Sequence, residues 1–212
     1  TLDTFTQIEF QKVIKFMKDN SEDTTWSWFI PILRLMLVSG CRISEAVNMR
    51  INELSFFEEN GKDIIEWKFR GKGNKERTFY IDSSTTQSDI IDAIKDENGE
   101  IRTDKEWVFH KRFWKGGNKY GAGIGMIDNV DEPFTISGVG HKFKKMVKLL
   151  KLNPKLTPHS TRRYFITEKL LSSGGNIPLV ALLVGHSSFE MVNHYQKHNQ
   201  QVVYYLLYHL SF

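Results

Sequence analysis

The last third of the chain carries residue types that could together cleave a phosphodiester. His159 and Arg162 lie three residues apart, and His186 and Tyr195 follow further along the chain. A second arginine, Arg42, lies far upstream. A planar guanidinium can bind two phosphate oxygens at once, and an imidazole can donate a hydrogen bond or move a proton near neutral pH. These residues therefore indicate a candidate site at which a tyrosine attacks a phosphate.

Attack on a phosphodiester builds negative charge on its non-bridging oxygens, which many enzymes offset with magnesium. Arg42 and Arg162 could do this without a metal. A tyrosine hydroxyl, with an ordinary pKa of about 10, is a weak nucleophile until a base and nearby positive charge assist it. The departing sugar oxygen needs a proton, which Lys72 in a glycine-rich turn could supply. We expect no metal and no cofactor, because no carboxylate or cysteine pattern accompanies the pair His194 and His198.

Apolar periodicity predicts the elements that position these residues in the first half of the chain. Residues 6–17 are typical of a capped helix, and the apolar stretch 29–38 predicts a buried helix that Gly40 can end. Another helix is expected over 42–49. Within it, Glu45 is either a helix-surface acid or a buried partner that orients the arginine, and we favour the partner.

A basic β-hairpin is predicted next. Residues 64–69 alternate apolar and polar side chains, and 77–81 form a second β-like run. The intervening Gly-Lys-Gly-Asn is turn chemistry, which puts Lys72 at or beside the tip. The segment carries several cations against a single acid. We expect Lys75 and Arg77 to contact DNA.

Two further segments lie before the motif of the last third. The glycine-rich residues 114–133 are expected to form a long mobile loop. Residues 135–152 return to a helical pattern, with lysines surrounding an apolar stripe. That lysine face is either an ordinary solvated surface or a DNA-backbone contact through Lys142 and Lys145.

The motif itself begins with a strong helix start. Thr157 suits the N-cap and Pro158 the first helical position. This puts His159 and Arg162 on one face of the first turns, where the helix dipole favours an anion. A short helix is expected over 177–184.

Bulk composition sets broad limits. The chain has 212 residues, a net charge of +4 and one cysteine. The mild basic bias fits nucleic acid without proving it, and one cysteine excludes an internal disulfide. No apolar run approaches the roughly 18 residues of a membrane span. We expect a cytoplasmic protein, because the chain has a single cysteine and no signal peptide. We also expect a fragment of something longer, because the chain does not begin with Met.

Taken together, these residues make the chain resemble the catalytic domain of the tyrosine site-specific recombinases, the phage integrase family. The resemblance lies in three blocks, residues 38–45, 71–77 and 157–195. The third block is the most specific. His159 and Arg162 meet the family pattern His-x-x-Arg, His186 ends an approximate match to Leu-Gly-His, and Tyr195 follows at the family's usual distance.

The resemblance implies a mainly α fold with a small antiparallel β-sheet, and a role for each residue. Tyr195 would attack the scissile phosphate and form a 3′-phosphotyrosyl link. Lys72 would be the general acid, with Lys75 a less favoured substitute, and His159 would assist proton transfer. The residues that would hold the phosphate are Arg42, Arg162 and His186. Rejoining would need no ATP, because the covalent link conserves the bond energy.

The resemblance also implies domains and partners. Residues 1–198 would form the catalytic domain, and 199–212 a C-terminal helix that docks on a neighbouring protomer. The partners would be double-stranded DNA and other copies of the chain in a homotetramer, with no membrane. The N-terminal core-binding domain would be absent from this fragment. Two departures are Arg163, where the family often has His and where we expect a DNA contact, and the insertion-like segment 114–133.

Two rival functions remain open. A type IB topoisomerase would use the same chemistry to relax DNA, would act as a monomer and would not need an apolar terminal helix in a neighbour. A catalytically silent DNA-binding protein of the same fold would have at least one broken catalytic position, and the sequence shows none.

Overall fold

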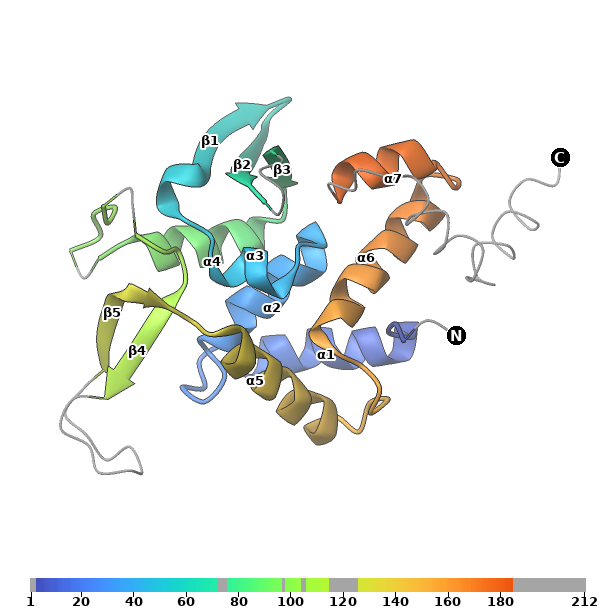
Figure 1. Cartoon of the computed structure of the whole chain (residues 1–212), viewed down its shortest axis with the longest axis horizontal. Coiled ribbons are helices and arrows are strands. Elements are labelled where there is room, and N and C mark those ends of the chain that lie inside the picture. The colour runs from blue at the N-terminus through green and yellow to red at the C-terminus, as the bar shows by residue number, and fades with distance from the viewer. Residues whose placement is uncertain (1–2, 72–75, 97, 104–105, 115–125, 185–212) are drawn as a thin grey trace, which may run out of the picture.

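The fold is known from a computed structural model. It describes residues 3–71, 76–96, 98–103, 106–114 and 126–184, with the side chains of 111–131 excepted. Within these ranges the chain is mainly helical with a small antiparallel sheet, as the sequence predicted (Figure 1). The helices are α1 Gln7–Asp19, α2 Phe29–Ser39, α3 Ile43–Val47, α4 Ser84–Ile94, α5 Ile136–Leu149, α6 Pro158–Ser172 and α7 Ile177–Leu183, with a short 3-10 helix at Ile51–Glu53.

The core forms around α2, which the sequence predicted as a buried helix. Most of its side chains are buried, and it packs against α3, α4 and α6. It ends at Gly40, which adopts a left-handed conformation with φ of +65°. A Cβ at Gly40 would lie 2.5 Å from the ring of Phe165. The end of α2 and the side of α6 can therefore approach this closely only with glycine at the junction.

Three strands form one sheet in the order β1-β2-β3, all antiparallel. Their bounds are β1 Leu54–Glu59, β2 Lys62–Arg70 and β3 Glu76–Ile81. The predicted hairpin is confirmed in β2 and β3, where Phe69 pairs with Arg77. Trp67, Phe69 and Phe79 stack on one face, and Trp67 donates a hydrogen bond to Glu53 Oε2 at 3.1 Å. The aromatic contacts and this hydrogen bond thereby hold β2 and β3 against the core.

The structure corrects one prediction and adds elements that the sequence reading missed. The long loop expected at 114–133 was wrong in its second half, because Met126–Pro133 forms strand β5 and pairs with β4, His110–Trp114. Residues 115–125 lie outside the described part. Strand β1 and helix α4 were not predicted. The β4-β5 pair lies on the opposite side of the molecule from α6 and α7 (Figure 1).

Helix α6 crosses the molecule between α7 and the pair α1 and α5 (Figure 1). Tyr164 holds it against α1 by stacking on Phe10, with ring centroids 4.3 Å apart. Its N-terminus begins where predicted, with Thr157 as N-cap and Ser160 Oγ accepting the Thr157 backbone N–H at 3.0 Å. The start of α6 is therefore anchored locally as well as by packing.

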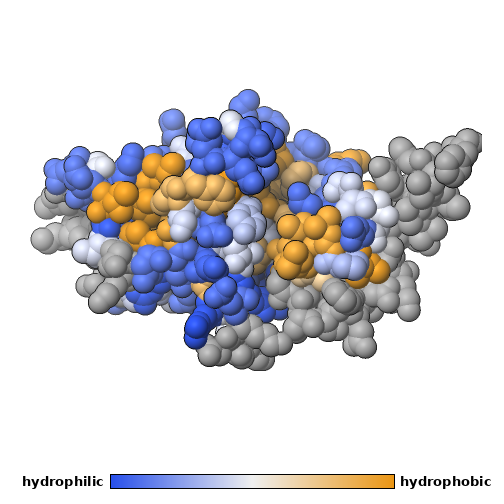
Figure 2. Space-filling view, turned by 90° about the horizontal axis from the view of Figure 1, so that it is seen from above, coloured by the Kyte–Doolittle hydropathy of each residue, from blue (hydrophilic) through white to orange (hydrophobic). Residues whose placement is uncertain are grey.

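The surface seen from above carries apolar and polar areas side by side (Figure 2). Exposed large apolar side chains in the described residues include Phe56, Phe57, Leu179 and Leu182. None of the described helices combines the length and the apolar character that a membrane crossing requires.

Substituting Gly40 by Ala should destabilise the protein more than the same change at another left-handed glycine. The backbone strain costs about 1–2 kcal/mol, and crowding against Phe165 adds roughly 1–3 kcal/mol. Gly61, with φ of +75° and nothing within 4 Å of an added Cβ, is the matched control and should show the strain alone. Urea unfolding of both variants measures the difference. Equal losses would contradict the close contact between α2 and α6.

Candidate active site

Arg162 is buried at the junction of three helices. It projects from α6 and is only 1 % exposed. One terminal nitrogen donates to the carbonyl of Gly40 at 2.6 Å, and the other donates to the carbonyl of Val184 at 2.7 Å. Gly40 and Val184 are the C-caps of α2 and α7. Carbonyl oxygens at helix C-termini lack partners within the helix and carry partial negative charge, so they suit a buried cation.

Burial lowers the pKa of Arg162 to about 10, and the positive charge of Arg42 contributes in the same direction. The group still remains charged at neutral pH. A guanidinium has further N–H donors beyond the two used on the carbonyls, and these can serve a phosphate oxygen. Arg162 bonds the carbonyl of Gly40, two residues before Arg42, so the two arginines, predicted to act together, lie near each other.

Glu45 holds Arg42 from the first turn of α3. Glu45 Oε2 accepts the backbone N–H of Arg42 at 2.8 Å, and Oε1 accepts from its guanidinium at 2.9 Å. The carboxylate side chain is 9 % exposed, against 38 % for the Arg42 side chain. The sequence left open whether Glu45 is a surface acid or a partner of Arg42. The structure shows the partner.

Arg77 joins the same carboxylate from β3. Its guanidinium donates to Glu45 Oε1 at 2.8 Å, and its side chain is 9 % exposed. Sequence reasoning placed Arg77 among the DNA contacts and missed this ion pair. A signal was present, because Arg77, Phe79 and Ile81 occupy alternate positions of one strand and hence the same face. Phe79 and Ile81 are buried, so that face turns inward.

His159 lies exposed in the first turn of α6. Partial desolvation lowers its pKa below the usual value, and the charges of Arg163, Arg162 and Arg42 lower it further. The imidazole is then largely neutral near pH 7 and able to accept a proton.

A cleft of about 620 Å³ opens beside these groups. It lies between α3 and the β2-β3 hairpin. Its lining includes Arg42, Glu45, Asn48, Arg70, Gly71 and Arg77. Arg42 is therefore placed where a phosphate entering the cleft could meet a partly exposed guanidinium.

The predicted DNA contacts on the helices have partners within the chain. Lys142 lies over the rings of Trp26 and Trp28, with Nζ 4.3 and 5.7 Å from the two centroids. Burial and then Lys145 lower the pKa of Lys142. Lys145 lies 5.9 Å from the Trp26 ring, and Arg163 donates to the carbonyl of Asp3 at 3.4 Å. Their role at DNA stays a prediction.

Four of the predicted site residues lie outside the described part of the chain. They are Lys72, Lys75, His186 and Tyr195. The structure thus brings together Arg42, Arg162 and His159, and adds Glu45 and Arg77. Whether the tyrosine, the second histidine and the hairpin lysines meet this group stays a prediction.

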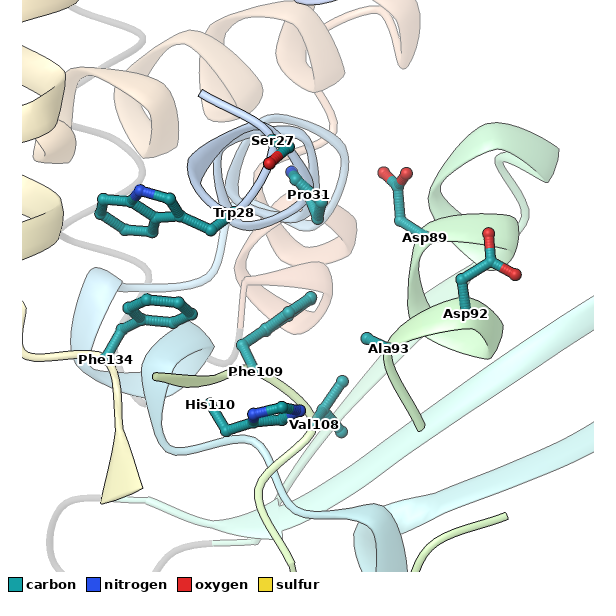
Figure 3. A pocket seen from close by; sticks show the side chains of 10 residues that line it. All are labelled: Ser27, Trp28, Pro31, Asp89, Asp92, Ala93, Val108, Phe109, His110 and Phe134. Carbon is teal, nitrogen blue, oxygen red and sulfur yellow. The ribbon is translucent and has the colours of Figure 1, made fainter. Parts of the chain in front are cut away.

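A second, smaller hollow of about 200 Å³ lies elsewhere, between the start of α2, α4 and residues 108–110 (Figure 3). Trp28 and Phe134 stack at one side of it, and Asp89 and Asp92 enter from α4 (Figure 3). Asp89 is already paired with Arg34. Among the described residues no cluster of three or more histidine, cysteine or carboxylate side chains could hold a metal.

Comparison with known proteins places the chain in a family. The profile of the phage integrase family matches residues 3–202. The tyrosine recombinase XerC of Leptospira interrogans is 25% identical over 187 residues, covering 88% of this chain and 52% of the relative. XerC of Listeria innocua is 27% identical over 164 residues, covering 77% and 47%. The chain belongs to the phage integrase family, and it spans about half the length of these relatives.

Solved structures give the same fold. XerH site-specific recombinase bound to a palindromic difH substrate superposes with a TM-score of 0.67 at 16% identity, covering 94% of this chain and 51% of that chain. XerA recombinase gives 0.63 at 19%, covering 95% and 62%. The Tn1549 transposon integrase in complex with transposon right end DNA gives 0.59 at 19%, covering 99% and 66%. At these identities the likeness establishes the fold.

Replacing Arg163 by Gln should raise the pKa of His159, because it removes a positive charge that disfavours the imidazolium. An NMR titration of the His159 ring, assigned with His159→Gln, measures the shift. Lys169→Gln removes a charge further along α6 and serves as the matched control. A pKa of His159 that is unchanged in Arg163→Gln, or that shifts equally in the control, would contradict the electrostatic account.

Proposed function

We propose that this chain is the catalytic part of a site-specific DNA recombinase that cuts and rejoins DNA through a 3′-phosphotyrosyl intermediate, without metal or ATP. The observation that carries the proposal is the convergence of Arg42, Arg162 and His159. Arg162 bonds the carbonyl of Gly40, 122 residues away in sequence. Burial lowers the pKa of His159, and the charges of Arg163, Arg162 and Arg42 lower it further. Two guanidiniums and a neutral imidazole gathered in this way suit a phosphodiester.

In the proposed reaction the Tyr195 oxygen attacks the scissile phosphorus, and the bond from phosphorus to the 5′-oxygen breaks. His159 accepts the phenol proton, and Lys72 donates a proton to the departing 5′-oxygen. The charge that develops on the non-bridging oxygens is stabilised by Arg42, Arg162 and His186. The reverse sequence, with a different 5′-hydroxyl as nucleophile, rejoins the strand.

Membership of the family supports action on double-stranded DNA, and so do the structures of XerH bound to its difH substrate and of the Tn1549 integrase bound to transposon DNA. We propose that this chain acts in the same way, in the compartment that holds its DNA. We also propose a homotetramer on DNA, in which the apolar residues 199–212 dock on a neighbouring protomer. The apolar composition of those residues supports that assembly.

Tyr195→Phe should abolish covalent capture of DNA and leave binding affinity within about 3-fold, because the change removes only the nucleophilic oxygen. The substrate is a nicked duplex that carries the site the protein selects from a random-sequence DNA library. Denaturing gel electrophoresis measures the adduct, and a filter assay measures affinity.

Tyr164→Phe is the matched control, because Tyr164 is a packing residue on α6. It should keep the adduct. Undiminished adduct in Tyr195→Phe would sink the proposed nucleophile.

A further inference from the structure

One carboxylate serves two guanidiniums at the edge of the cleft. Glu45 Oε1 accepts from Arg42 at 2.9 Å and from Arg77 at 2.8 Å, while Oε2 is engaged by the Arg42 backbone N–H. Both oxygens of Glu45 are thus occupied. Because a single negative charge faces two positive ones, the group keeps a net positive charge.

The two arginines differ in access to solvent. The Arg42 side chain is 38 % exposed, whereas the side chains of Arg77 and Glu45 are each 9 % exposed. Both arginines line the cleft, but Arg42 offers far more of its guanidinium to a ligand there, whereas Arg77 is nearly buried against Glu45. Burial lowers the pKa of Arg77, Glu45 opposes this, and Arg42 adds to it. Glu45 is thus the partner that favours the charged form of Arg77.

The position of Arg77 is fixed by packing as well as by its ion pair with Glu45. A Cβ at Gly71 would lie 2.8 Å from Arg77 Nε, so the guanidinium lies directly against the backbone at the end of β2. The pairing of Phe69 with Arg77 sets this register. The flat guanidinium thus lies between the turn end of the β2-β3 hairpin and Glu45 of α3. A lysine would keep a charge there but lose the planar fork.

Removing Arg77 would change what Glu45 does to Arg42. With Oε1 no longer shared, the carboxylate would be free to form a two-point pair with Arg42, the geometry that arginine and carboxylate favour. Such a neutral pair would compete with a phosphate for the same guanidinium. By sharing the carboxylate, Arg77 weakens this competition and still leaves Glu45 holding Arg42 at the start of α3.

We infer that Arg77 is a positioning residue for phosphodiester cleavage: from β3 it occupies the Glu45 carboxylate and so keeps Arg42 available to the scissile phosphate. This inference rests on the proposed function, because it takes Arg42 to bind the phosphate. It differs from a direct DNA contact by Arg77 in one measurable way. A positioning residue acts through Glu45, so its effect depends on whether Glu45 is present.

The first test is single-turnover covalent capture by the whole chain at saturating nicked duplex. Arg77→Met should slow capture roughly 10-fold or more and change DNA affinity less than about 3-fold. Arg77→Lys should lie between Arg77→Met and the unaltered protein. The double variant Glu45→Gln/Arg77→Met should be no slower than the slower single variant, because the two changes remove parts of one unit. Lys68→Met removes a charge from an exposed ion pair on the same hairpin and should leave the saturated rate within about 2-fold.

The second test does not depend on catalysis. Phenylglyoxal modifies accessible arginine side chains, and mass spectrometry of the peptide containing Arg42 gives its rate in the free protein. Arg77→Met should slow modification of Arg42 several-fold, because Glu45 then pairs with it fully. Adding Glu45→Gln should restore the rate. If Arg77→Met folds poorly, Gly71→Ala displaces the Arg77 side chain without removing its charge and should show the same pattern.

The outcomes separate the two claims. In one outcome the unaltered protein captures DNA, Arg77→Met leaves the reactivity of Arg42 unchanged, and the capture losses add up in the double variant. That outcome would overturn the positioning role and leave the recombinase proposal standing. In the other outcome the unaltered protein forms no adduct, while the reactivity of Arg42 follows the expected pattern. That outcome would overturn the recombinase proposal and support the positioning of Arg42 by Arg77.

Discussion

The buried guanidinium of Arg162 is the constraint on which the site depends. It comes from α6 and satisfies the carbonyls that end α2 and α7. Without these hydrogen bonds, each helix end would present unpaired carbonyls to the protein interior, and the buried guanidinium would lack hydrogen-bond partners. The guanidinium and the two helix ends therefore stabilise one another. Arg42 follows Gly40 by two residues, so its place at the start of α3 depends on a point that Arg162 fixes.

A second layer of charge is built on this anchor. Glu45 holds Arg42 and is itself held by Arg77, so the exposed arginine of the cleft is supported by two nearly buried side chains. Partial burial, and then the neighbouring positive charges, favour the neutral form of His159. The excess of positive charge that would attract a phosphate thus also helps to keep the histidine neutral and able to accept a proton. Both properties come from the same close grouping of side chains.

Much of this could be predicted from the sequence where the signal is local. Gly40 ends a continuous apolar helix directly before Arg42, and Thr157 with Pro158 begins the helix that carries Arg162, so both of these helices were found. Strand β1 was missed because its side chains are nearly all exposed and its pairing with β2 alone defines it. Strand β5 was missed because its partner, β4, precedes the glycine-rich segment. The chemistry of Arg162 could be foreseen, but not its carbonyl partners, because backbone contacts between distant helix ends leave no trace in residue types.

Amide hydrogen exchange in Arg162→Met tests this account most directly. Protection should fall together at residues 40–47 and 177–184, two segments far apart in sequence that Arg162 joins, while α1 at Gln7–Asp19 should keep its protection. Unchanged protection at both segments would contradict the account. So would a uniform loss that includes α1, since the guanidinium would then support the whole fold and not the junction of α2, α6 and α7.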